Sequence, residues 1–313
     1  MKFGVVLPTY RNLASPDNIV RVAVEAERLE LDSVWVTDHI VIPEASASAF
    51  GSIFYEAITT MAYIAALTER VAIGAAILVV PYRHPLLTAK MLATVDQFSR
   101  GRVILGAGLG WLEQESGLLG VDFKHRASVT DEALQAMRSA WTNPRPVFAG
   151  RHFRFDALHF EPGSCSPGGI PTWIGGVSDK ALHRAATLGH GWISDGQTFD
   201  EIRPCIRRLH ESLEAHGRDP KGFVISLRTG LQVVEAADEV TRSRGLKGWQ
   251  ATTDAPESGR IPFRGTLLQV VEDVLEAERL GIGDLIFEFP VARGEESLDL
   301  MAQLAEIRRR TGR

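Results

Sequence analysis

Two polar residues, Asp38 and His39, interrupt an apolar stretch near the start of the chain. The stretch is SVWVTDHIVIP, residues 33–43, and it begins with an apolar run typical of a buried strand. Along an extended strand, Thr37 and His39 share one face and Asp38 takes the other. A histidine can donate or accept a hydrogen bond and titrates near neutral pH, which suits it to proton transfer. The alternative is structural: Asp38 caps the next turn and His39 packs.

Three alternate glycines, Gly106, Gly108 and Gly110, form a second pattern in the sequence GAGLGW. Glycines at this spacing let a backbone approach a flat ligand closely. As a dinucleotide-binding fingerprint the pattern is weak, because Trp111 takes the place of its last glycine and the first strand lies far away in the chain. We therefore expect cofactor contacts here, without assigning a dinucleotide.

A double glycine precedes a predicted helix in WIGGVSDKAL, residues 173–182. Gly175, Gly176, Val177 and Ser178 would lie at the start of that helix, where free backbone N–H groups and the helix dipole favour a phosphate. The other interpretation is a plain helix cap by Ser178, and the aspartate that follows slightly disfavours an anion. We favour phosphate binding, because a double glycine is more than a cap needs.

The elements that must position these residues follow one repeating order. Eight short apolar runs alternate with helical stretches such as 178–188, 201–216 and 266–280. Strands that are apolar on both faces, each followed by a helix, indicate a parallel sheet of the α/β class. Eight such units favour a closed (β/α)8 barrel over an open doubly wound sheet, and catalytic groups in such barrels lie at the C-terminal ends of strands. The predicted strands are 3–8, 33–37, 71–80, 102–108, 172–176, 191–195, 223–230 and 284–289.

Two stretches break this order within what we interpret as a single domain, residues 1–313. Residues 143–171 are rich in proline and glycine, and HFRFDALHFEP within them alternates like a small hairpin. Residues 236–263 are polar and glycine-rich. Long loops in a compact domain are usually functional lids or disordered segments. The second stretch is either a lid over the substrate or a surface insertion.

The composition argues against a nucleic-acid-binding or membrane-spanning protein. The chain has 313 residues, 45% hydrophobic and 23% charged, with a net charge of −5, as is usual for a soluble enzyme. The sequence lacks the basic patch with interleaved aromatic residues that would indicate nucleic-acid binding. It also lacks an uninterrupted apolar run long enough to predict a membrane span. The two cysteines follow no metal or disulfide pattern, and we expect no metal site. The N-terminus does not read as a signal peptide, so a cytoplasmic location is the default.

Several motifs together resemble a known family. WVTDH, AAILVVPYRHPL, VDQFSRGR, LGAGLGWLEQE and PTWIGGVSDKALHRAATLGHGW are similar to the luciferase-like monooxygenase superfamily. The most similar branch is that of the deazaflavin-dependent oxidoreductases, which use coenzyme F420. The resemblance spans residues 1 to about 230, and the last third matches only in its barrel pattern.

The resemblance implies a barrel whose mouth holds a flavin or deazaflavin. The ring would lie near the ends of strands two to four, in contact with Thr37, Asp38, His39 and the 106–111 stretch, and the phosphate would lie near residues 175–178. His39 would lie beside the reactive ring, in a proton-transfer or orienting role. The third strand would end in a bulge under the ring, with a cis peptide bond between Ala76 and Ile77.

The chain departs from the family pattern at two positions. Where the flavin monooxygenase branch has an arginine that holds the FMN phosphate, this chain has Leu109. Where sugar-phosphate dehydrogenases of the deazaflavin branch have a glutamate general acid, it has Trp111. Glu113 or Glu115 could replace that glutamate, although both lie on an incipient helix, where surface or salt-bridge roles are commoner; Glu113 is taken as the catalytic candidate.

These observations predict a coenzyme F420-dependent oxidoreductase that acts on an organic small molecule. The first alternative is an FMN-dependent monooxygenase that activates O2, against which Leu109 argues. A second is a cofactor-binding barrel without turnover, in which His39 would be idle. A homodimer is retained as a candidate assembly.

Overall fold

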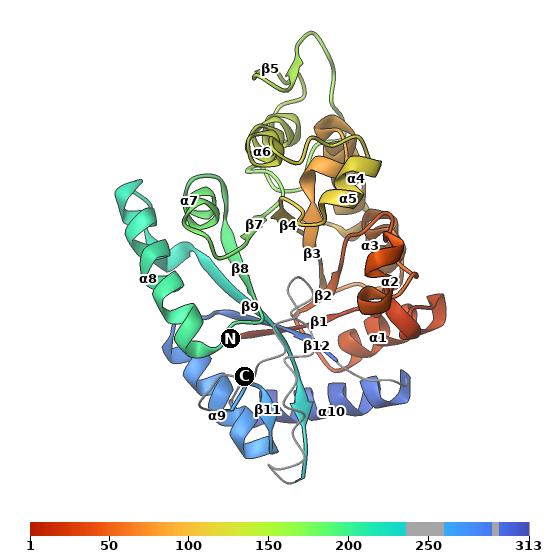
Figure 1. Cartoon of the computed structure of the whole chain (residues 1–313), viewed down its shortest axis with the longest axis vertical. Helices are drawn as coiled ribbons and strands as arrows, with labels where there is room; N and C mark the ends of the chain where they lie inside the picture. The colour runs from red at the N-terminus through yellow and green to blue at the C-terminus, as the bar shows by residue number, and fades with distance from the viewer. Residues whose placement is uncertain (236–259, 290–293, 313) are drawn as a thin grey trace.

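Eight parallel strands close into a barrel in the computed structural model (Figure 1). The structure describes residues 1–235, 260–289 and 294–312. Around the barrel the strand order is β1-β12-β9-β8-β7-β4-β3-β2, so the sheet closes where β1 pairs with β12. This confirms the closed barrel over an open sheet. The barrel strands are β1 (Lys2–Val6), β2 (Ser33–Val36), β3 (Ala72–Val79), β4 (Val103–Gly108), β7 (Thr172–Gly175), β8 (Gly191–Asp195), β9 (Val224–Gly230) and β12 (Asp284–Glu288).

Helices cover the outside of the barrel (Figure 1), and the long helices bury apolar side chains in the core. In the first helix, Ser15 accepts a hydrogen bond from the Asn18 amide and Pro16 is the first helical residue. Both residue types favour a helix start at these positions. The long helices are α1 (Pro16–Arg28), α3 (Ala57–Leu67), α4 (Pro85–Ser99), α6 (Arg126–Thr142), α7 (Asp179–Leu188), α8 (Phe199–Ala215), α9 (Leu267–Arg279) and α10 (Gly294–Arg310).

The end of β3 is irregular, as the resemblance implies. The pairing of β3 with β4 shifts register between Ala75 and Leu78, which marks a bulge. The peptide bond between Ala76 and Ile77 is cis, which confirms that expectation. The bulge lies at the C-terminal end of the barrel, the same end at which β2 leads into Asp38 and His39.

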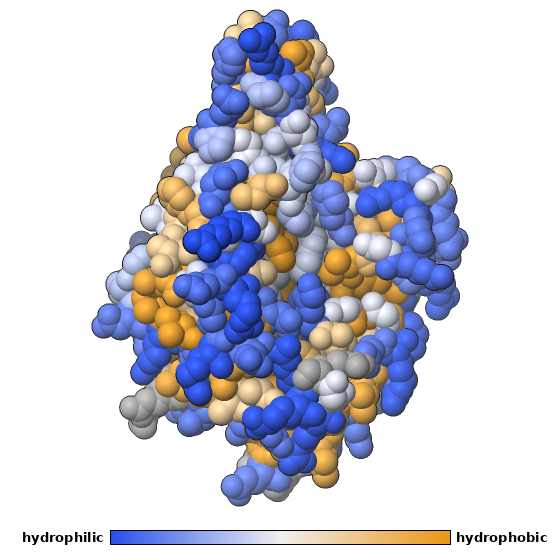
Figure 2. Space-filling model, turned by 180° about the vertical axis from the view of Figure 1, so that it is seen from behind, coloured by the Kyte–Doolittle hydropathy of each residue, from blue (hydrophilic) through white to orange (hydrophobic). Residues whose placement is uncertain are grey.

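The first insertion carries a small hairpin, but its position differs from the prediction. Strand β5 (Phe148–Ala149) pairs antiparallel with β6 (Arg154–Phe155), so only part of the alternating stretch is strand. The Glu132 carboxylate of α6 fixes the turn by accepting hydrogen bonds from the amides of residues 151–153. The hairpin extends beyond α6 and forms a narrow, mostly hydrophilic projection (Figures 1 and 2).

The second insertion lies largely outside the described residues. Residues 236–259 are not described, so the lid predicted for 236–263 is not tested. On either side, β10 (Gln232–Val233) pairs with β11 (Arg264–Gly265). In the described part of the chain, no helix has the length and apolar character needed to cross a membrane. The same residues contain no group of three or more His, Cys, Asp or Glu side chains that could hold a metal ion.

Candidate active site

A buried histidine–carboxylate pair lies where β2 and β4 leave the barrel. Nδ1 of His39 is 2.6 Å from Oε2 of Glu115, and His39 is only 5% exposed. The other oxygen of Glu115 accepts hydrogen bonds from the amides of Ile40, at 2.7 Å, and Val41, at 3.2 Å. The Tyr82 hydroxyl donates to Oε2 of Glu115 at 3.0 Å. These four contacts hold one carboxylate in a single orientation against the imidazole.

The Glu115 carboxylate is ionised at neutral pH because of these contacts. Burial alone would raise its pKa, but the hydrogen bonds from His39 and from the backbone amides outweigh burial and lower the pKa. Burial and the nearby Glu115 charge raise the pKa of Tyr82, so Tyr82 remains a donor. An ionised carboxylate can only accept, so Glu115 accepts a hydrogen bond from the Nδ1–H of His39, which fixes the tautomer of the imidazole.

Sequence reasoning chose Glu113 as the catalytic carboxylate, and the structure brings Glu115 to His39 instead. Both belong to the short helix α5 (Glu113–Leu118). Glu113 is exposed on its first turn, whereas Glu115 is fully buried. Residues two apart on a helix do not face the same way, so the helix directs only one of them at the barrel mouth. The sequence pattern alone allowed either glutamate.

Asp38 forms an ion pair on the opposite side of the strand end from His39. Both of its carboxylate oxygens accept hydrogen bonds from the Arg83 guanidinium, each at 2.8 Å, and one also accepts from the Val79 amide. The same guanidinium reaches Glu56 at 2.7 Å. Asp38 therefore links the end of β2 to the end of β3, and its contact with a cofactor stays a prediction. Thr37 is buried, with its hydroxyl 3.3 Å from that of Thr9.

Aromatic rings flank His39 on several sides. The ring centroids of Phe54, Phe50 and Trp111 lie 5.1, 6.2 and 6.1 Å from that of His39. Tyr10 stacks on Phe54 with the centroids 5.0 Å apart. These rings come from the loops after β1, β2 and β4, where α2 (Glu44–Phe50) contributes Phe50. They are half-buried, so part of their apolar surface remains accessible.

The alternate glycines make room for the bulge of β3. An ideal Cβ on Gly106 would lie 2.1 Å from the Ala75 carbonyl oxygen, and one on Gly108 would lie 2.8 Å from Cγ2 of Ile77. A Cβ on Gly175 would lie 1.9 Å from Cδ1 of Ile77. The side chain of Ile77 thus occupies the space that Gly108 and Gly175 leave, and the Ala75 carbonyl occupies the space at Gly106. The close approach seen here is that of the protein's own bulge, and the contact of these glycines with a cofactor stays a prediction.

The start of α7 has the cap that the sequence offered as the alternative to phosphate binding. The Ser178 hydroxyl accepts a hydrogen bond from the Ala181 amide at 3.3 Å. Gly176 has a φ of +110°, a backbone conformation that favours glycine. Gly176, Val177 and Ser178 are exposed. Arg208 donates to Asp179, which offsets the negative charge that argued against an anion. Ser178 therefore caps α7 while residues 176–178 at its start remain exposed.

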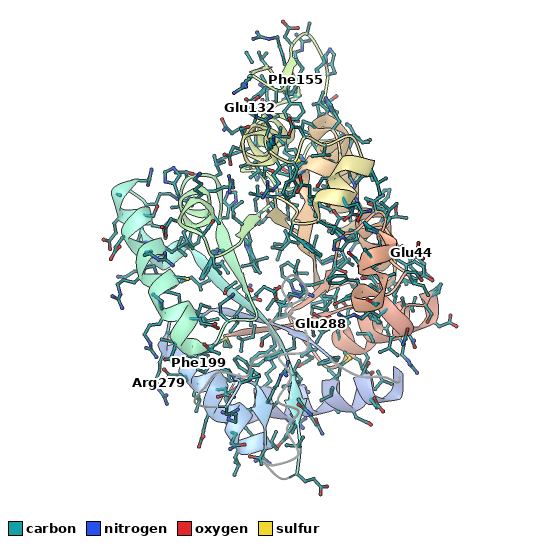
Figure 3. All side chains as sticks on the ribbon, in the orientation of Figure 1. Glu44, Glu132, Phe155, Phe199, Arg279 and Glu288 are labelled. Atoms are coloured by element: carbon teal, nitrogen blue, oxygen red, sulfur yellow. The ribbon has the colours of Figure 1, made fainter. Side chains whose placement is uncertain are left out.

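A second buried network crosses the barrel mouth. Arg228 on β9 reaches the Ala76 carbonyl on β3 at 3.2 Å, and these strands lie on opposite sides of the barrel. Its guanidinium also bonds Glu288 at 2.6 Å and lies 3.8 Å from Asp195, and the Tyr10 hydroxyl donates to Glu288. Glu288 projects near the centre of the ring of strands (Figure 3). Sequence reasoning missed this network, although Arg228 and Glu288 stand near the ends of two predicted strands.

Comparison with known proteins identifies the family. The family model of the luciferase-like monooxygenases matches residues 1–269, which is most of the chain. The chain belongs to the luciferase-like monooxygenase family. The His39–Glu115 pair, the β3 bulge and the aromatic rings lie at the barrel mouth of this member of the luciferase-like family.

Relatives of this luciferase-like protein use two kinds of cofactor. It is 29% identical over 208 residues to an F420-dependent glucose-6-phosphate dehydrogenase of Amycolatopsis mediterranei, and the match covers 64% of this chain and 61% of that relative. It is 26% identical to an FMNH2-dependent dimethylsulfone monooxygenase of Pseudomonas fluorescens, over 81% of this chain and 74% of the relative.

Solved structures share the same barrel. The monooxygenase RslO1 of Streptomyces bottropensis superposes with a TM-score of 0.80 at 22% identity, over 98% of each chain. An F420-dependent secondary alcohol dehydrogenase superposes with a TM-score of 0.80 at 19% identity, over 99% of this chain and 98% of that chain. At such identities the agreement concerns the fold of the luciferase-like chain.

Proposed function

We propose that this luciferase-like protein is a coenzyme F420-dependent oxidoreductase that transfers a hydride between the deazaflavin and an organic small molecule. The observation that supports it most directly is the His39–Glu115 pair at the mouth of the barrel, because a carboxylate that orients a histidine is suited to proton transfer. A proton must leave or join a substrate hydroxyl when a hydride is moved to or from its carbon.

The residues at the mouth fit a flat cofactor. Ile77 offers a half-buried apolar surface, and Gly108 and Gly175 leave room for its side chain. The exposed start of α7, residues 176–178, offers backbone amides to a phosphate. We propose that the ring rests against Ile77 beside Gly108, Gly110 and Trp111. When bound, the deazaflavin would accept or supply the hydride.

We propose that side chains of the protein transfer the proton of the substrate hydroxyl. Glu115 holds Nδ1 of His39 protonated, so that Nε2 accepts a proton from a substrate hydroxyl during oxidation and donates it back during reduction. Tyr82 and the two backbone amides keep Glu115 in place during both steps. The rings of Phe50, Phe54 and Trp111 exclude water from the imidazole, which strengthens its interaction with the substrate.

Leu109 supports the deazaflavin over FMN. It stands where the flavin monooxygenase branch has a phosphate-binding arginine, and a leucine cannot replace a charge-assisted bond to phosphate. The relative that uses FMNH2 keeps an FMN-dependent monooxygenase as the second candidate. A side-by-side titration of the apoprotein with coenzyme F420 and FMN tests the choice. We expect tighter binding of F420, and equal or tighter binding of FMN would contradict the proposal.

A further inference from the structure

A cavity of about 60 Å³ lies at the N-terminal ends of β7 and β8, the barrel end opposite His39. Thr172, the first residue of β7, and His190, directly before β8, line it together with Arg138 of α6 and Leu188 at the end of α7. Its volume is several times the ~10–15 Å³ that one water molecule needs. The cavity can therefore hold a small polar ligand, away from the candidate active site.

The imidazole of His190 is held in one orientation by the start of β7. The Thr172 amide donates a hydrogen bond to Nδ1 of His190 at 3.1 Å, and the His190 amide donates to the Thr172 carbonyl at 2.6 Å. Because Nδ1 accepts, the neutral ring carries its proton on Nε2. The ring is half-buried, and among the described residues Nε2 has no hydrogen-bond acceptor. His190 therefore offers a ligand one N–H donor that no described protein atom uses.

Two arginines bring uncompensated positive charge to this cavity. In the part of the chain that the structure describes, neither Arg138 nor Arg218 has a carboxylate within ion-pair distance. The Arg218 guanidinium donates to the Ala186 carbonyl at 2.6 Å and lies over the Phe223 ring. Burial lowers the pKa of His190, and the charges of Arg138 and Arg218 lower it further. Burial and the charge of Arg138 also lower the pKa of Arg218. The three side chains thus form a cluster that a bound anion would stabilise.

We propose that this cavity binds a small tetrahedral oxyanion, inorganic phosphate or sulfate, through Arg138, Arg218 and the Nε2–H of His190. A guanidinium presents its N–H groups in a planar fork that matches the oxygens of phosphate, and such charge-assisted hydrogen bonds are short and strong. The anion would link α6 to the loop before β8 and to the loop after α8. The site does not depend on the proposed function, because it lies at the other end of the barrel.

Calorimetric titration of the whole chain with sodium phosphate would measure this binding, in an amine buffer whose ionic strength is held constant with chloride. We expect one saturable site. Arg138→Gln should raise the Kd of phosphate by at least about 10-fold, because loss of a hydrogen bond to a charged group is of that order. Arg138 is exposed, so the variant should fold like the parent. Arg218→Gln should weaken binding in the same direction.

Arg151→Gln is the matched control, because it removes the same charge from the exposed turn between β5 and β6. The position of the anion is read from the ring resonances of His190, identified by their loss in His190→Gln, which should shift as phosphate is added. The proposal is wrong if phosphate shows no saturable binding, if Arg151→Gln weakens it as much as Arg138→Gln does, or if these resonances do not move. Phenyl phosphate that binds as tightly as phosphate would contradict the assignment to a small free anion.

Discussion

The side chain of Ile77 on β3 fills the space that a side chain at position 175 on β7 would occupy. The atom in conflict is Cδ1 of Ile77, 1.9 Å from an ideal Cβ on Gly175, whereas Cγ1 would lie at 3.3 Å. The bulge and the strand end beside it therefore depend on each other, at the place where we propose that the cofactor ring rests.

The pair can be tested by a double-mutant cycle. Gly175→Ala should destabilise the protein by about 1–3 kcal/mol, because an added methyl group in a packed site forces side chains to shift. Ile77→Val removes Cδ1, so the double variant should recover much of that loss. Free energies of unfolding from urea titration would measure this coupling. Additive effects of the two substitutions would show that Ile77 does not fill this space.

His39 should be required for turnover and not for cofactor binding. A positioned acid or base contributes about 10²–10⁴-fold in rate, so His39→Ala should lower kcat by a factor in that range. The Kd of F420, measured by fluorescence titration, should change little. A kcat within about threefold of the parent value would exclude His39 from proton transfer.

The two neighbouring glutamates should behave differently. Glu115→Gln removes the charge that holds Nδ1 of His39 protonated, so we expect kcat to fall by about 10–100-fold. Glu113→Gln, on the exposed first turn of α5, should leave kcat near the parent value and serves as the matched control. Steady-state kinetics of both variants with one substrate would measure this. Equal losses in the two variants would return Glu113 to the catalytic role.

Asp284 should make the stability depend on pH. It is buried at the first position of β12, at the barrel end opposite His39, and burial raises its pKa to about 7. Because the pKa is higher in the folded than in the unfolded chain, where it is about 3.9, the folded state favours protonated Asp284. Its contribution to stability is full below the unfolded pKa and is lost as the pH rises through about 7.

The test of this linkage is Asp284→Asn, which cannot titrate. Between pH 6 and pH 8, the parent should lose about 1–1.5 kcal/mol of stability relative to the variant. Chemical unfolding at both pH values would measure the difference, and kcat should stay unchanged because Asp284 lies away from the mouth. Parallel pH profiles of the two proteins would show that Asp284 is not protonated in the fold.

Local sequence patterns were enough to predict the barrel and to place His39 at the C-terminal ends of its strands. Continuous apolar runs followed by amphipathic helices leave few alternatives to buried parallel strands. Each of the eight predicted strands overlaps an observed barrel strand to within a few residues. His39 was found because a polar pair directly after a buried strand is conspicuous.

The groups that contact His39 could not be predicted from local patterns, because they come together only in the folded chain. Glu113 and Glu115 are two residues apart and chemically alike, and the direction of α5 relative to β2 chooses between them. Arg228 and Ala76 are 152 residues apart, and they meet only because β9 and β3 stand opposite each other in the closed barrel. Gly106, Gly108 and Gly175 make room for Ala75 and Ile77 of the β3 bulge, since contacts between different strands depend on register and closure, which no local pattern records.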